Sequence, residues 1–423
     1  MTPTPAQAPG PEPGRPASEP SSEPTQPGRP TQPGGWLTSP DVLMALVLGA
    51  AGFYLGAMGS VIVLLAEDLG LQPADLGWVG SVFGVALLAV AFLGPALLRI
   101  GSQRLLAIST ALSAVGFIVL ALAKTLPVVA LGAGLQAAGG AATILLGPVL
   151  LSGPTADVRL TRVNAVSSVV SVVSPLVVGA MIAASLDGRL ALLISAVPMA
   201  VVAAAATRNS RFPTPPLTIP AAPPSAAATG EPTPGEAVRP GGDDVVGRPP
   251  TWLVLRRWLA IVMGVAAEFA FLVWAVARLV EAGLGTGLAA TVGASFPIGM
   301  AVGRVLGPWV IAHLPAVPVG ASVSAVGTVL VVVGPSWPFI SAGLILAGLG
   351  IATFYPVTLA RLMSVPGLRQ SLATSLGALA SGTAITLAPA GLALLGSAVD
   401  LRLAYLVVLP LLGALVLLHG RVR

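Results

Sequence analysis

The chain has 423 residues, of which 55% are hydrophobic and only 9% are charged, whereas soluble domains average about 25% charged residues. So little charge cannot cover a surface in water, and most of the chain is therefore expected to lie in lipid. The net charge of +5 does not indicate nucleic-acid binding, because the basic residues are scattered at the ends of apolar segments, and the absence of cysteine excludes disulfides, zinc–thiolate sites and thiol nucleophiles.

Residues 1–40 are dominated by Pro, Ser, Thr, Glu and Gly. Such a composition cannot bury enough apolar surface to offset the entropy of ordering, so we predict a disordered tail. The tail lacks the charged start and apolar core of a secretory signal peptide, and the first apolar segment is expected to act as an uncleaved anchor. Residues 208–253 have the same character and are predicted to form a disordered linker.

Two hydrophobic stretches of equal length, 41–207 and 254–420, flank this linker. A bilayer core of roughly 30 Å requires about 20 apolar residues per helix, and each stretch divides into six runs long enough to cross it. In chain order the runs are 42–65, 76–98, 105–123, 127–151, 163–186, 190–206, 258–280, 287–312, 317–334, 338–362, 372–395 and 403–418. We therefore predict an all-α integral membrane protein with 12 transmembrane helices in two six-helix bundles, one for each stretch.

The basic residues predict the orientation of these helices. With the N-terminus inside, 17 of the 21 Lys and Arg residues fall on the inner side and 4 on the outer side. Because positive residues favour the cytoplasmic side, both termini and the linker are predicted to be cytoplasmic, in a multi-pass protein of the cell membrane. Two histidines, His313 and His419, are too few for a multi-histidine metal site, and neither a metal nor another cofactor is expected.

A short glycine–arginine motif follows the second apolar run. It reads Gly94-Pro-Ala-Leu-Leu98-Arg99, and the same glycine-to-arginine spacing recurs at Gly299 and Arg304. The motif resembles the G-x-x-x-D-R-x-G-R-R signature of the major facilitator superfamily of secondary transporters, although Leu98 stands where that family carries aspartate. We expect Arg99 and Arg304 to lie at or near cytoplasmic helix ends, where they either gate the protein or extend their charge to the membrane surface.

Proline motifs add to this resemblance. The run 163–186 contains Ser-Val-Val-Ser-Pro175, which is similar to the family's G-x-x-x-G-P-x-x-G antiporter motif with serines in place of two glycines. Pro389 occupies nearly the same place in the second stretch. Segments 268–274 and 348–356 look instead like the sugar-permease branch of the family, so the motifs leave the direction of transport open.

The resemblance implies a mechanism. Members of this superfamily work by alternating access, in which two six-helix bundles rock around a site near mid-membrane and open it first to one side and then to the other. It also implies gating roles for the motif residues, which are Gly94, Arg99, Pro175, Arg304 and Pro389. The expected partners are a small-molecule solute, protons and the lipid bilayer, and the protein is expected to be a monomer that binds no nucleic acid.

Glu268 is the most distinctive single residue, because it lies midway between Arg257 and Arg278, the basic residues that bracket its apolar run. A carboxylate at this depth costs about 3 kcal/mol unless it meets a cavity, a partner or a proton. Our hypothesis is that Glu268 couples proton movement to transport or binds a polar group of the solute. The alternative is a structural glutamate that is hydrogen-bonded between helices.

Four further side chains are candidates for the solute site. Tyr355 precedes Pro356, where a broken helix would expose backbone carbonyls, and Trp274 supplies an aromatic ring in the same run as the glutamate. Gln136 and Asn164 are polar residues within apolar runs. Packing against a neighbouring helix or lipid is the alternative for Trp274, and hydrogen bonds between helices are the alternative for Gln136 and Asn164.

The sequence favours proton-coupled efflux of a drug-like or metabolite solute, because the proline motif is typical of antiporters and polar side chains suited to a sugar are scarce. A sugar or metabolite uptake permease is the first alternative. A membrane sensor or scaffold that does not transport is the second, since the motif aspartate is missing. The sequence contains no phosphate-binding loop and no nucleophile–base–acid set, so an enzyme is not expected.

Overall fold

The computed structural model describes residues 39–153, 155–208 and 249–420. The predicted disordered tail 1–40 and linker 208–253 fall almost wholly outside these ranges. Within them, twelve helical segments are long and apolar enough to cross a membrane, and no strand occurs. The predicted all-α membrane fold, with 12 transmembrane helices in two six-helix bundles, is confirmed.

The first half contains six uninterrupted membrane helices. Their bounds are α1 Pro40–Leu69, α2 Gly77–Leu98, α3 Ser102–Ala121, α4 Leu126–Leu150, α5 Ala156–Ala183 and α6 Leu192–Arg208. Two short 3-10 helices, η2 Pro73–Leu76 and η3 Gly188–Ala191, precede α2 and α6. The predicted runs locate all six helices. However, α5 begins seven residues before the predicted position 163, because its first turns carry Arg159 and Arg162 and continue the helix beyond its apolar part.

The second half also contains six membrane segments, three of which are interrupted. The bounds are α7 Thr251–Glu281, α8 Thr286–Gly293, α9 Ser295–His313, α10 Ala316–Val333, α11 Trp337–Ile351, α12 Phe354–Met363, α13 Gln370–Ala398, α14 Leu401–Ala404, η4 Tyr405–Val407 and α15 Val408–His419. One membrane segment is formed by α8 with α9, a second by α11 with α12, and a third by α14, η4 and α15.

Each interruption lies about four residues before a proline. Proline has no N–H for the carbonyl four residues earlier, and its ring collides with that carbonyl. The prolines are Pro297, Pro356 and Pro410, and the residues four positions earlier are Gly293, Ala352 and Leu406. The break expected beside Tyr355 is therefore present, between α11 and α12. In contrast, Pro175 and Pro389 lie inside the unbroken helices α5 and α13.

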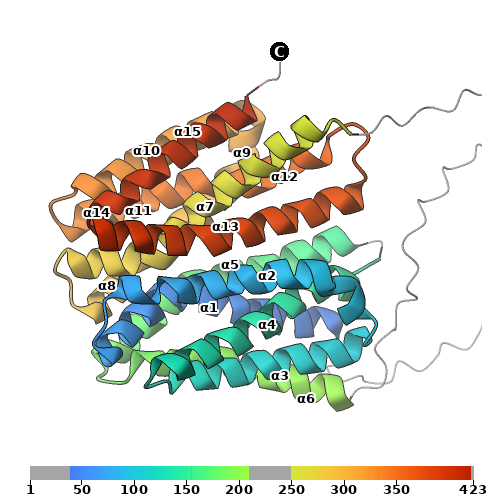
Figure 1. The fold of residues 1–423 in the computed structure, drawn as a ribbon, viewed down its shortest axis with the longest axis horizontal. Helices are drawn as coiled ribbons and strands as arrows, with labels where there is room; N and C mark the ends of the chain where they lie inside the picture. The colour runs from blue at the N-terminus through green and yellow to red at the C-terminus, as the bar shows by residue number, and fades with distance from the viewer. Residues whose placement is uncertain (1–38, 154, 209–248, 421–423) are drawn as a thin grey trace, which may run out of the picture. The chain divides into compact units, whose positions relative to one another are not determined.

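The two halves contact each other through reciprocal pairs of helices. The second membrane segment of the first half, α2, packs on the fifth of the second half, α13; conversely α5 packs on α8 and α9, and α1 packs on α7. Figure 1 draws the first half in blue to green and the second in yellow to red. This reciprocity fits two repeats that are related by an axis along the membrane normal.

Close approach of α2 and α13 depends on a glycine. A Cβ atom on Gly84 would lie 2.7 Å from the carbonyl carbon of Ile385 and would also collide with the backbone of Thr386.

At one end of the interface, the Thr286 hydroxyl of α8 donates a hydrogen bond to Glu67 of α1. We call this end, where α1 and α7 finish, the outer side and the opposite end the inner side, in keeping with the predicted orientation.

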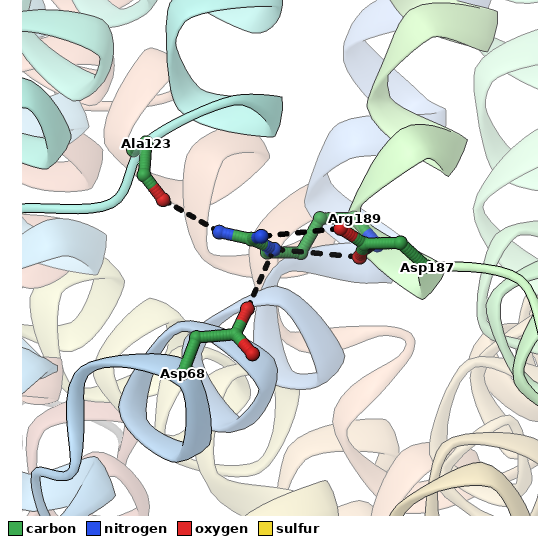
Figure 2. A network of polar contacts seen from close by, with 4 residues as sticks. All are labelled: Asp68, Ala123, Asp187 and Arg189. Carbon is green, nitrogen blue, oxygen red and sulfur yellow. Dashed lines mark hydrogen bonds and ion pairs between the residues drawn. The ribbon is translucent and has the colours of Figure 1, made fainter.

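On the outer side, Arg189 joins three parts of the first half (Figure 2). Its Nη1 donates to the carbonyl of Ala123 at 2.6 Å. Its Nε lies 2.9 Å from a carboxylate oxygen of Asp68, and its Nη2 lies 3.1 Å from one of Asp187. These contacts connect the end of α1, the α3–α4 connection and the α5–α6 connection. We name Asp68, Ala123, Asp187 and Arg189 the first outer clamp.

The second half repeats part of the first outer clamp. The sequence Asp-Gly-Arg-Leu-Ala that begins at Asp187 recurs as Asp400-Leu-Arg402-Leu-Ala with an offset of 213 residues, and Glu281 follows Asp68 by the same offset. In both halves the aspartate accepts a hydrogen bond from the arginine backbone N–H. An additional arginine of the second half, Arg278, pairs with Glu281 at 3.6 Å. The internal repeat therefore extends to the outer ends of both halves.

Candidate functional site

Glu268 lies in the middle of α7 and pairs with an arginine of α9. Its Oε1 atom is 3.8 Å from Nη2 of Arg304, and the two side chains are 21% and 46% exposed. The Nη1 atom of Arg304 donates a hydrogen bond of 2.9 Å to the hydroxyl of Ser168 in α5. Because α5 belongs to the first half and α7 and α9 belong to the second, these three side chains cross the interface between the halves.

Two glycines of α9 determine the direction in which Arg304 points. Gly299 and Gly303 are one turn apart and pack on α11, where a Cβ atom on Gly303 would lie 2.6 Å from the carbonyl oxygen of Leu349. Successive residues of a helix point about 100° apart, since a turn contains about 3.6 residues. Arg304 is therefore directed away from α11, toward α5 and α7.

Tyr355 and Ser381 complete the site. Tyr355 lies in the first turn of α12, directly after the helix break, and is 37% exposed. Its hydroxyl lies near that of Ser381 in α13, and it is close enough to Glu268 for an electrostatic interaction. One acid, one base and three hydroxyls thus gather near the middle of their membrane segments. We call Ser168, Glu268, Arg304, Tyr355 and Ser381 the central polar group.

The ion pair in the central polar group is loose. Charge-assisted N–H···O hydrogen bonds are about 2.7–2.9 Å long, whereas Glu268 and Arg304 are 3.8 Å apart and Arg304 is half exposed. This geometry leaves guanidinium N–H groups available to another ligand. The pair still gives Glu268 the counter-charge that a carboxylate requires at this depth. The arrangement can therefore bind a polar solute group and can exchange a proton at Glu268.

An apolar layer lies on the outer side of Glu268. Phe271, one turn farther along α7, stacks on Phe296 with ring centroids 5.4 Å apart, and its ring centroid is 5.3 Å from that of Tyr405. All three rings are fully buried. A small hollow beside this layer is lined by residues of both halves, among them Pro175. The stacked rings form a buried apolar layer on the outer side of the central polar group.

Trp274 lies in a packed helix contact. It is fully buried, and its Nε1 donates a hydrogen bond of 3.2 Å to the carbonyl of Pro389. Its ring also lies against Gly77, and Pro389 lies against Gly80. Trp274 and Pro389 are thus brought together where α7, α13 and α2 meet, and in this conformation they are separate from the central polar group.

Gln136 and Asn164 also lie apart from the central polar group. Gln136 is 2% exposed and packs against the backbone of Gly116 in α3, and its Oε1 has no hydrogen-bond partner in the described chain. Asn164 is exposed on α5, one turn before Ser168, whose hydroxyl donates to the Asn164 carbonyl at 3.1 Å. No ion pair or hydrogen bond between described residues joins either of them to Glu268.

The two glycine–arginine motifs occupy different depths. Arg99 is exposed and caps the inner end of α2, while Gly94 packs near Leu145 of α4. Arg304 is followed by nine further residues of α9 and lies in the central polar group. The expectation that Arg304 lies near a helix end is therefore wrong. An arginine so far inside an apolar run requires an acidic partner, and Glu268 is that partner.

Sequence reasoning missed Ser168 and Ser381. Serines occur in many of the apolar runs, and nothing in the local sequence distinguishes these two. Their importance follows from the packing of α5 on α9 and of α13 on α12. Among the residues that the structure describes, no cluster of three or more His, Asp or Glu side chains could hold a metal ion.

Comparisons with known proteins agree with this fold. The family model described as Major Facilitator Superfamily matches residues 43–321. The nucleoside transporter NupG superposes with a TM-score of 0.69 at 13% identity, with 92% of this chain and 100% of that chain covered. The peptide transporter POT, solved in complex with sulfate, gives a TM-score of 0.66 at 14% identity, with 90% and 95% covered.

A third solved structure is a bacterial homolog of the human lysosomal transporter Spinster, in an inward-facing and unoccupied conformation. It gives a TM-score of 0.58 at 13% identity, with 90% of this chain and 95% of that chain covered. No curated protein matches the sequence. At such low identities the structural likeness shows the fold alone.

Proposed function

The chain belongs to the major facilitator superfamily, and from this premise we propose that it exports a drug-like or metabolite solute in exchange for protons. The family and the fold make the chain a secondary transporter of a small solute rather than an enzyme. The direction of transport, the solute and the coupling ion are the parts that we propose.

The main support for coupled transport is the contact between Glu268 and Arg304, which Ser168 of the other half completes. Contacts within one half persist when two bundles rock as rigid bodies, whereas contacts between the halves change. The Glu268–Arg304 pair lies within the second half, but the hydrogen bond from Arg304 to Ser168 crosses to the first half and therefore changes with access. This property is what a coupling site requires.

We assign the transported proton to Glu268. In the described conformation, the positive charge of Arg304 lies 3.8 Å from Glu268 and supplies the counter-charge that a carboxylate requires at this depth. When the halves rock, Ser168 moves relative to Arg304, and the guanidinium is drawn toward Ser168 or toward the bound solute. Glu268 then loses its counter-charge and takes up a proton, because an unpaired carboxylate at this depth is costly. Proton binding and release thus alternate with access.

The remaining hydroxyls suit a solute with polar groups. Tyr355 is 37% exposed and lies beside Ser381, and Arg304 is half exposed. These groups supply donors and acceptors around one acid, Glu268. The stacked rings of Phe271 and Phe296 form an apolar layer on the outer side of the central polar group. We expect this layer to limit proton leakage in the described conformation.

Flux measurements in proteoliposomes test the proposal. The purified full chain would be reconstituted, and movement of nucleosides, dipeptides, sugars and cationic dyes would be measured with and without an imposed pH gradient. We expect at least one solute to move against its own gradient when protons move in the opposite direction. The control variant Asp75→Asn, which changes an exposed acid in the short helix η2 at the outer end of its membrane segment, keeps this behaviour. Solute flux that is the same with and without the pH gradient contradicts the proposal.

Uptake of a polar metabolite is the second candidate function. It is favoured by the three hydroxyls around the Glu268–Arg304 pair, which suit a polar solute better than an apolar drug. In the same assay, solute that accumulates together with protons identifies uptake. A membrane sensor or scaffold moves none of the compounds, with or without the gradient.

A further inference from the structure

A cluster of basic side chains lies at the inner end of the second half. Arg256 and Arg257 belong to the second turn of α7, Arg361 to the end of α12 and His419 to the end of α15. Nη2 of Arg256 donates to two carbonyls at the end of α15, at 3.0 and 2.8 Å. Nη1 of Arg361 donates to the carbonyl of His419. These bonds tie the inner ends of three helices together.

The first two arginines of this cluster lack an acidic partner. Among the described residues, no carboxylate lies within 4.0 Å of Arg256 or Arg257. The end of α15 contributes only about half a negative charge. The positive charges of Arg361 and Arg256 act on Arg257, and all three arginines act on the buried ring of His419. Arg256 and Arg257 therefore carry positive charges that no described carboxylate balances.

Arg257 also presents a buried donor without an acceptor. Its Nη1 atom is inaccessible and has no hydrogen-bond partner in the described chain. A buried polar group that is left unpaired costs about 1–3 kcal/mol, and more when it is charged. The planar guanidinium fork matches the oxygens of a phosphate group. The unpaired donor and the unbalanced charge together indicate a site for a phosphate-bearing anion.

We propose that Arg257, with Arg256 and Arg361 beside it, binds the headgroup phosphate of an anionic phospholipid in the inner leaflet. The depth of the cluster favours a lipid as the source of the phosphate. Trp252 and Leu255, within one turn of the arginines, are 63% and 49% exposed, and exposed tryptophan is typical of the interface between membrane and water. Basic pockets between helices on the cytoplasmic side hold anionic headgroups in this way. This site is independent of the function proposed above.

Lipid binding to the purified full chain tests the proposal by native mass spectrometry. We expect wild-type protein to bind phosphatidylglycerol more tightly than phosphatidylcholine. Arg257→Gln weakens phosphatidylglycerol binding about tenfold, which is the value of one charge-assisted hydrogen bond. Arg257→Lys keeps the charge and loses less affinity than Arg257→Gln. The matched control Arg104→Gln, which changes an exposed arginine at the inner end of α3, binds as wild type does.

Two further measurements distinguish a lipid phosphate from other sources of negative charge. If inorganic phosphate displaces phosphatidylglycerol at equal concentration, the site binds soluble phosphate and the lipid proposal is overturned. If phosphatidylglycerol binds only after Asp243 and Asp244 are both changed to Asn, those linker residues occupy the cluster in the native chain, and the proposal is again overturned. Unchanged lipid binding in that double variant supports it. Equal binding of both lipids, or wild-type binding by Arg257→Gln, overturns it directly.

Discussion

Arg189 and Arg304 are held in opposite ways. The Arg189 side chain is 8% exposed and has three partners at 2.6 to 3.1 Å, all within the first half. The Arg304 side chain is 46% exposed, its acid is 3.8 Å away, and its second partner, Ser168, belongs to the other half. A tight network inside one bundle resists movement, whereas a loose network between bundles changes with it. The comparison separates an arginine that stabilises the fold from one that responds to conformational change.

The largest effect on stability is expected when the first outer clamp is broken. Arg189→Met leaves Asp68, Asp187 and the Ala123 carbonyl without their shared donor. We expect the free energy of unfolding to fall by about 3 kcal/mol, at the lower end of the range for a broken buried ion pair, because both carboxylates are nearly half exposed. Denaturant unfolding in detergent measures this change.

Arg304→Met is the matched comparison for that variant. It should lower the free energy of unfolding by only about 1 kcal/mol, since the ion pair is loose, Arg304 is half exposed, and Glu268 can take up a proton when its partner is removed. Equal losses of stability in the two variants would show that the two arginines are not held differently.

A second comparison concerns glycines at tight and open positions. A Cβ atom on Gly84 would collide with α13 of the other half, whereas one on Gly134 meets nothing within 4 Å. Gly84→Ala should lower the free energy of unfolding by about 2 kcal/mol through overpacking. Gly134→Ala should be neutral or slightly stabilising, because alanine favours the helix. Thermal unfolding of both variants checks this, and a neutral Gly84→Ala would mean that the contact between halves is looser than described.

The smallest expected effect concerns Asp400 in the second half. Its side-chain hydrogen bond with Glu281 and its bond from the backbone N–H of Arg402 hold the pKa of Asp400 below its ordinary value of 3.8. A carboxyl whose pKa is lowered on folding stabilises the fold above its ordinary pKa, and this contribution is lost as the pH falls. Between about pH 5 and pH 3, wild-type protein should lose slightly more stability than Asp400→Asn. Parallel pH profiles of the unfolding midpoint would contradict this.

The membrane segments are predictable from the sequence because the thickness of the bilayer sets the length of each apolar run. Helix ends are less predictable, since α5 and α7 each start seven residues before their runs, where polar residues continue the helix. The breaks before Pro297 and Pro410 are not predictable either. Pro175 leaves its helix unbroken, and the outcome depends on whether neighbouring helices satisfy the freed carbonyl.

The candidate site is predictable in part. The sequence singles out Glu268 by its depth and Tyr355 by its proline, and the structure brings these two side chains together. The sequence does not show which helix faces meet, so the pairing with Arg304 and the contribution of Ser168 emerge only from the packing. The repeated Asp-x-Arg-Leu-Ala motif is readable from the sequence, and it locates the outer end of each half.

Proton movement in Glu268→Gln tests the central claim most directly. Proteoliposomes that contain a pH-sensitive dye would report protons moved when a solute gradient is imposed on wild-type protein and on Glu268→Gln, with Asp75→Asn as the control. We expect the wild type and the control to move protons in the direction opposite to the solute. Glu268→Gln should lose this movement at least about tenfold while solute exchange without a gradient continues, because an amide cannot carry the proton. Wild-type proton movement in Glu268→Gln would contradict the account.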